Sequence, residues 1–152
     1  METATLILQI LTLLVAAVGP FLAYKYARKL AVSSNRQAWI DALRDDVAHF
    51  IALKESRMMI MRDQARIDPG GMVTQRSTDE LLRDKNIELQ AARHRVRLRL
   101  RTGNAMHDRL AMAVEEFAKA GYEADRGPLR AEIVDAAEAV ITHTWNKVER
   151  GE

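Results

Sequence analysis

The feature that most constrains this chain is an uncharged apolar segment close to its N-terminus. Residues 3–24, TATLILQILTLLVAAVGPFLAY, contain no Asp, Glu, Lys or Arg. As an α-helix they would span about 33 Å at roughly 1.5 Å per residue, which matches a bilayer hydrocarbon core of about 30 Å. The segment therefore predicts a single membrane-spanning helix.

Two other interpretations of this segment stay open, a cleaved signal peptide and a buried helix of a soluble protein. A signal peptide has a basic start and a short apolar core that ends at a small-residue cleavage site. Here Glu2 is the only charged residue before the apolar run, and the run passes directly into basic residues. These observations favour a retained membrane anchor.

The charges that flank the segment predict its orientation. Basic residues follow it and none precedes it. Because Lys and Arg near a span favour the cytoplasmic side, we expect the C-terminal part of the chain to lie in the cytoplasm. Aromatic and basic side chains just after a span commonly lie at the interface with anionic headgroups. The residues assigned to this membrane interface are Tyr24, Lys25, Tyr26, Arg28 and Lys29.

The composition of the chain favours an all-α protein. Its 152 residues are 5% aromatic, with 7 Gly and 3 Pro, and the abundant Ala, Leu, Arg, Glu and Met lose little entropy in a helix. Cysteine is absent, which excludes disulfides, thiol catalysis and thiolate metal sites. The formal net charge of +2 is too small for the whole chain to attract nucleic acid.

Apolar periodicity divides the rest of the chain into four helices. The first starts at the N-cap-type residues 33–35 and ends at the DPGG sequence of residues 68–71. The sequence leaves open whether the helix of the apolar segment continues unbroken through Ser33 and Ser34 into this first helix. Ser77 and Glu80 fit a capping box for the second helix, which the TGN sequence of residues 102–104 ends. Asn104 caps a third helix, with Leu110, Ala113, Val114 and Phe117 on its inner face, and the GP sequence of residues 127–128 opens the last. We therefore predict a transmembrane anchor with a juxtamembrane segment, residues 1–33, followed by a cytoplasmic helical bundle, residues 34–152.

The basic stretch HRVRLRLRTGN, residues 94–104, fits either a strand or a helix end. A lone strand would leave its backbone groups unpaired, so the helix is favoured. In a helix, one apolar stripe contains Leu82, Leu89, Val96 and Leu100, and a second contains Ile87, Ala91 and Leu98. Two stripes predict a helix that is packed on two sides.

Three arginines of this helix are spaced by four residues and share one face: Arg93, Arg97 and Arg101. They have three open interpretations. They complement the helix dipole while their stems cover apolar surface; they bind an anion such as a lipid headgroup, a nucleotide or RNA; or they pair with acidic residues of a neighbouring subunit, for which the candidates are Glu115, Glu116, Asp135 and Glu138. No aromatic residue alternates with them, which disfavours nucleic acid.

The chain shows no catalytic, cofactor or metal-binding motif. The histidines are scattered, and no pair has the spacing of a known zinc motif. Asp45 and Asp46, next to Arg44, are expected on a solvated helix face. We predict no enzyme activity, no cofactor and no metal, and instead a homo-oligomer that contacts other proteins. The interface candidates are Gly19, which would let another helix approach closely, and Met58 and Met61 on the apolar stripe.

Two segments, NRQAWIDALRDDVAHFI (residues 35–51) and THTWNKVERGE (residues 142–152), resemble small, largely uncharacterised bacterial and prophage-type membrane proteins. The resemblance implies one membrane helix, a helical cytoplasmic region, a location in the bacterial inner membrane and a role in phage–host interplay. We therefore expect a non-enzymatic, membrane-anchored protein that acts by self-association and protein–protein contact. The alternative is a membrane effector of antiviral defence, gated by a nucleotide bound at the three arginines.

Overall fold

The computed structural model describes residues 2–66, 72–121 and 123–150. Within its helices, the side chains of residues 2–11, 14, 15, 65, 66 and 72–77 lie outside the description. The described residues form four helices and no strand: α1 (Glu2–Arg66), α2 (Met72–Arg99), α3 (Ala105–Lys119) and α4 (Arg126–Arg150). The all-α prediction is therefore confirmed.

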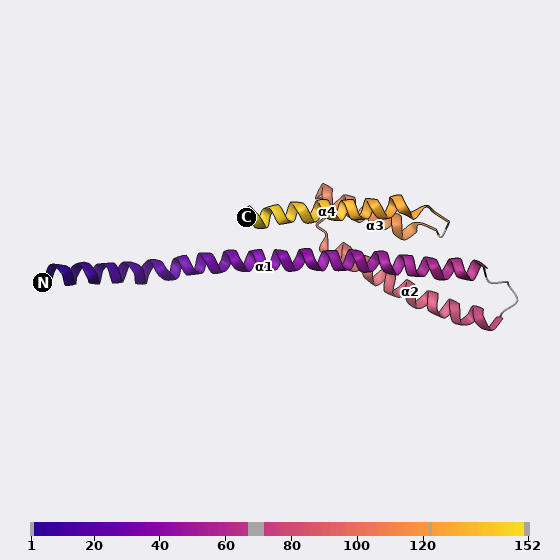
Figure 1. Cartoon of the computed structure of the whole chain (residues 1–152), viewed down its shortest axis with the longest axis horizontal. Helices are drawn as coiled ribbons and strands as arrows, with labels where there is room; N and C mark the ends of the chain where they lie inside the picture. The colour runs from indigo at the N-terminus through magenta and orange to yellow at the C-terminus, as the bar shows by residue number, and fades with distance from the viewer. Residues whose placement is uncertain (1, 67–71, 122, 151–152) are drawn as a thin grey trace.

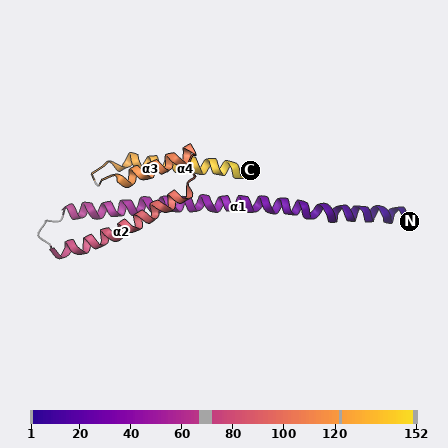
Figure 2. The same ribbon diagram turned by 180° about the vertical axis from the view of Figure 1, so that it is seen from behind.

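The helices are arranged as a bundle around one half of α1 (Figure 1). The N-terminal part of α1 extends away from the bundle without a neighbour, and α2 folds back against its C-terminal part. Helix α4 packs on both α1 and α3, and it runs antiparallel to α1. Seen from behind, the C-terminal end of α4 again lies beside the middle of α1 (Figure 2). The C-terminal end of α4 therefore faces the projecting part of α1.

Helix α1 is continuous through the predicted start of the cytoplasmic region. The prediction of an N-cap at Ser33, Ser34 and Asn35 is wrong, because all three lie inside this 65-residue helix. The segment contains neither Gly nor Pro, so nothing prevents the helical hydrogen bonds from continuing. The open question of continuity through Ser33 and Ser34 is therefore answered by one unbroken helix, and Pro20 also lies inside it.

The start of α2 also differs from the prediction, whereas its end agrees. Helix α2 begins at Met72, so Ser77 is an interior residue and not an N-cap. At the other end the helix stops at Arg99, which confirms the helical interpretation of the basic stretch. Gly103 has a φ of 81°, a conformation that glycine adopts without strain. Asn104 caps α3 as predicted, since its Oδ1 accepts from the backbone N–H of Met106 at 3.1 Å.

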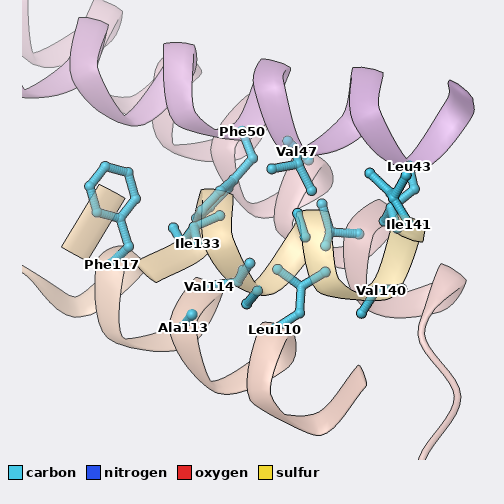
Figure 3. Close-up of a cluster of buried hydrophobic side chains, with 14 of the residues drawn as sticks. Leu43, Val47, Phe50, Leu110, Ala113, Val114, Phe117, Ile133, Val140 and Ile141 are labelled. Carbon is cyan, nitrogen blue, oxygen red and sulfur yellow. The ribbon is translucent and has the colours of Figure 1, made fainter. Parts of the chain in front are cut away.

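The core lies between α1, α3 and α4 and is completed by one face of α2. Figure 3 shows side chains of α1, α3 and α4 pointing toward one another. The rings of Phe50 and Phe117 meet edge to face with centroids 6.0 Å apart, a preferred aromatic geometry. The predicted inner face of α3 is confirmed, because Leu110, Ala113, Val114 and Phe117 are all buried.

Only one of the two predicted apolar stripes of α2 is buried. Leu89 and Val96 belong to the core, whereas Ile87 is 61% exposed and Leu98 is 85% exposed. The prediction of a helix packed on two sides is therefore wrong. The reason is the arrangement of the bundle, in which α2 packs mainly against α1 and contacts α3 only slightly.

The predicted membrane segment, residues 3–24, forms the projecting part of α1. Among the residues whose side chains are described, no helix offers a stretch that is long and apolar enough to cross a membrane. The side chains of a large part of the predicted anchor, residues 3–11, 14 and 15, are not among those described.

Candidate functional site

The basic end of α2 contacts two acidic residues, one on each neighbouring helix. The first is Asp46 of α1, which accepts from the Nε of Arg95 at 3.1 Å and from the Nε of Arg99 at 2.5 Å. Asp46 is only 9% exposed. The expectation that it lies on a solvated face is therefore wrong, although its neighbour Asp45 is exposed.

The second acidic residue is Glu115 of α3. Arg93 binds it with two hydrogen bonds, from Nε at 2.8 Å and from Nη2 at 2.5 Å, and this fork geometry suits a guanidinium and a carboxylate. Arg97 approaches the same carboxylate at 3.4 Å, and Gln90 accepts from Arg93 at 3.0 Å. One of the three open interpretations paired these arginines with acidic residues of a neighbouring subunit, Glu115 among them; here Glu115 of the same chain is the partner.

Arg101, the third arginine of the predicted anion site, lies beyond the end of α2 and is exposed. Its backbone N–H donates to Nδ1 of His107 at 3.0 Å. The imidazole of His107 stacks on Trp39, and burial is the largest cause that lowers its pKa. The structure therefore places Arg93 and Arg97 together on one carboxylate and Arg101 apart from them.

The arginine face leaves little space for a ligand beside Glu115. The crevice lined by Arg93, Arg97 and Glu115 has no room for a water molecule. The described residues include no group of three or more His, Asp or Glu that could hold a metal ion. The arrangement is suited to joining α2 to α1 and α3.

Lys54 is a polar residue whose role the sequence did not indicate. It interrupts the apolar stripe of α1 and is only 1% exposed. Its Nζ donates to the carbonyl oxygen of Ala118 at 2.7 Å and to that of Ala120 at 2.9 Å. These carbonyls lie at the C-terminal end of α3, where a helix lacks internal partners and a cation is favourable. Burial, followed by the charges of Arg57 and Arg126, lowers the pKa of Lys54 to about 8.

An open pocket lies in the angle between the projecting part of α1 and the end of α4. Its volume is about 800 Å³, and it is lined by aromatic, basic and apolar residues of α1 together with Val148 and Glu149 of α4. All five residues assigned to the membrane interface line this pocket. They are Tyr24, Lys25, Tyr26, Arg28 and Lys29. The structure therefore brings these predicted site residues together at a concave surface.

The three interface candidates occupy different environments. Met58 is 2% exposed and is therefore covered by its own chain, whereas Met61 is half-buried. Gly19 lies on the projecting part of α1, with nothing within 4 Å of the position that a Cβ would take.

The chain was compared with protein families, curated proteins and solved structures. No family model, no curated protein and no solved structure matches this chain.

Proposed function

We propose that this chain is a non-enzymatic, membrane-anchored helical protein that acts by contact with other proteins, including a second copy of itself. The observation that carries the proposal is that the uncharged segment of residues 3–24 is the first part of the same helix that forms the bundle. Residues that suit a membrane interface follow it directly. In this proposal the anchor spans the bacterial inner membrane once and the bundle lies in the cytoplasm.

The exposed strip of α2 supports the contact with other proteins. Ile87 and Leu98 expose most of their surface, and Ala91 between them is exposed as well. Exposed apolar side chains along one helix face are a common feature of protein–protein contacts. The alternative of a nucleotide sensor has weaker support, because Arg93 and Arg97 already contact Glu115.

Two charges placed in the anchor test the membrane proposal. We expect the full-length protein to remain in the membrane fraction after alkaline extraction. The double variant Leu13→Glu and Ala17→Glu should be released, because each charge within a span costs about 2.5–3.5 kcal/mol. The matched control is Ala48→Glu and Ala52→Glu, which has the same spacing at exposed positions of α1 in the bundle. Extraction of the unmodified protein would contradict the anchor.

The size of the full-length protein in detergent tests self-association. We expect a dimer or larger species whose mass falls with dilution. Ile87→Glu combined with Leu98→Glu should shift the protein toward the monomer, whereas Ala48→Glu with Ala52→Glu should not. A protein that is monomeric at every concentration would contradict self-association without affecting the anchor.

A further inference from the structure

The face of α1 that packs in the bundle continues beyond it as a basic face. Ile40 and Leu43 are fully buried in the bundle. At helical spacing of four or seven residues, the same face contains Arg36, Lys29 and Lys25 toward the N-terminus. These three residues line the pocket beside the end of α4. One continuous face of α1 therefore changes from apolar to cationic where α4 ends.

Among the described residues, the cations of this pocket form no ion pair, whereas several arginines of the bundle do. Arg93, Arg95, Arg97, Arg99, Arg109 and Arg130 all form ion pairs with carboxylates. In the described part of the chain, no carboxylate lies within ion-pair distance of Lys25, Arg28, Lys29 or Arg36. The sequence provides the reason, because it has no acidic residue between Glu2 and Asp41.

Among the residues that the structure describes, Glu149 is the single acidic residue that lines the pocket. Its carboxylate accepts a hydrogen bond from the indole Nε1 of Trp145 at 2.9 Å. Two further cations, Lys147 and Arg150, lie in the last turn of α4. The pocket is therefore a concave, positively charged surface with aromatic and apolar walls, and its volume is in the range of small-ligand sites.

We propose that this pocket binds the phosphate-containing headgroup of an anionic phospholipid in the leaflet that faces the bundle. The proposal rests on the membrane anchor proposed above, which would place Tyr24 and Lys25 at the headgroup layer. Lys25, Lys29 and Arg36 then direct their positive charges to the headgroup phosphate, while Phe21, on the membrane side of Lys25, lies beside the apolar part of the lipid. The end of α4 forms the other wall, so a bound lipid holds the bundle against the membrane surface.

The composition of lipid that remains bound to the purified full-length protein tests the site. The protein is mixed with equal parts of phosphatidylcholine and phosphatidylglycerol in detergent, purified, and its bound lipid is quantified by mass spectrometry. We expect phosphatidylglycerol to be enriched roughly fivefold, the ratio that corresponds to the interaction of one basic residue with an anionic surface. Lys25→Gln, Lys29→Gln and Arg36→Gln together should return the ratio to that of the mixture. An unchanged enrichment in this triple variant would overturn the proposal.

Two controls separate the pocket from a general effect of charge. Arg62→Gln, Arg83→Gln and Lys119→Gln together remove the same charge at exposed positions of the bundle and should leave the enrichment unchanged. Glu149→Gln removes the acidic residue of the α4 wall and should raise the phosphatidylglycerol enrichment. If Glu149→Gln has no effect, α4 does not line the site and the proposal fails. Inorganic phosphate added during purification should not displace the lipid; displacement would assign the site to free phosphate instead.

The anchor and the lipid site fail in different ways. Flotation with vesicles of phosphatidylcholine alone reports the anchor, because that lipid has no net charge. If the protein floats with these vesicles but shows no phosphatidylglycerol enrichment, the anchor is supported and the lipid site is contradicted. If the protein floats only when phosphatidylglycerol is present, the anchor is contradicted and the cationic pocket is supported.

Discussion

The Nζ of Lys54 lies 2.7 Å from the backbone carbonyl oxygen of Ala118, so a side chain of α1 closes the C-terminal end of α3. The carbonyl of Ala120 accepts from the same ammonium group. A lysine on an apolar stripe would be unfavourable alone, but here it supplies donors to carbonyls that the helix cannot satisfy. The contact joins residues that are 64 positions apart in the chain.

Replacement of Lys54 by Met should destabilise the bundle. The variant keeps an apolar stem of similar size and leaves the partly buried carbonyls of Ala118 and Ala120 without this donor. We expect a loss of about 1–3 kcal/mol in the free energy of unfolding, measured by urea titration in detergent. Lys119→Met is the control, because Lys119 is exposed and its loss should change stability by less than about 0.5 kcal/mol. Equal effects of the two variants would contradict the role assigned to Lys54.

The stability contributed by Lys54 should depend on alkaline pH. Burial lowers the pKa of its ammonium group from 10.5 to about 8 in the folded protein. Between these two values the unfolded chain holds a proton that the folded chain has released, so stability rises with pH. The advantage of the unmodified protein over Lys54→Met should therefore grow from about pH 8 to pH 10.5, by at most about 1.4 kcal/mol per pH unit. A decrease over this range would contradict the lowered pKa.

Asp46→Asn should destabilise the contact between α1 and α2. The amide provides one acceptor oxygen and no charge, so Arg95 and Arg99 lose a shared carboxylate that is mostly buried. We expect a loss of about 1.5–3 kcal/mol in the free energy of unfolding. The matched control is Asp41→Asn on the same helix. Its pair with Arg44 is 3.4 Å long and more than half exposed, so its effect should lie below about 1 kcal/mol.

The turn after α2 should lose stability in mild acid because of His107. Burial lowers the pKa of its imidazole from 6.5, while Nδ1 accepts from the backbone of Arg101. As the pH falls below 6.5 the unfolded chain takes up a proton that the folded imidazole resists, so stability decreases. His107→Phe retains a ring beside Trp39 but does not titrate. The difference in unfolding free energy between protein and variant should therefore fall from neutral pH to pH 5, and a constant difference would refute this.

Gly103→Ala should strain the connection between α2 and α3. Gly103 has a φ of 81°, where a Cβ costs roughly 1–2 kcal/mol even though no atom lies within 4 Å of it. Gly121→Ala is the control, because Gly121 also has open space but no positive φ. Thermal unfolding followed by circular dichroism should show a lower midpoint for Gly103→Ala only.

The sequence predicted the helices best where local chemistry determines them. Asn104 and Gly103 mark the turn between α2 and α3 through hydrogen bonding and backbone conformation, both of which are local. Ser33 and Ser77 were misleading, because serine caps a helix only if the chain before it leaves the helical conformation. Whether it does depends on the preceding residues and on packing.

The charged contacts could not be predicted in the same way. Asp45 and Asp46 are consecutive residues of the same type, yet only Asp46 faces α2. Glu115 was a candidate partner for the arginines, but the sequence could not assign it to the same chain. Lys54 appeared only as an interruption of the apolar stripe. Its partners are backbone carbonyls, which every residue has, so the sequence does not mark them. Such pairs depend on the rotation of each helix in the bundle.

The unbroken α1 also fixes the rotational phase between the projecting segment and the bundle. Each residue of a helix advances the next by about 100°. One residue inserted near Ser34 would therefore turn Lys25 and Lys29 away from the side on which α4 lies, without altering any contact inside the bundle. An insertion of about seven residues, close to two turns, would restore their direction and lengthen the spacing by about 10 Å. Direction and distance of the bundle relative to the N-terminal segment are thus set by the number of residues in one helix.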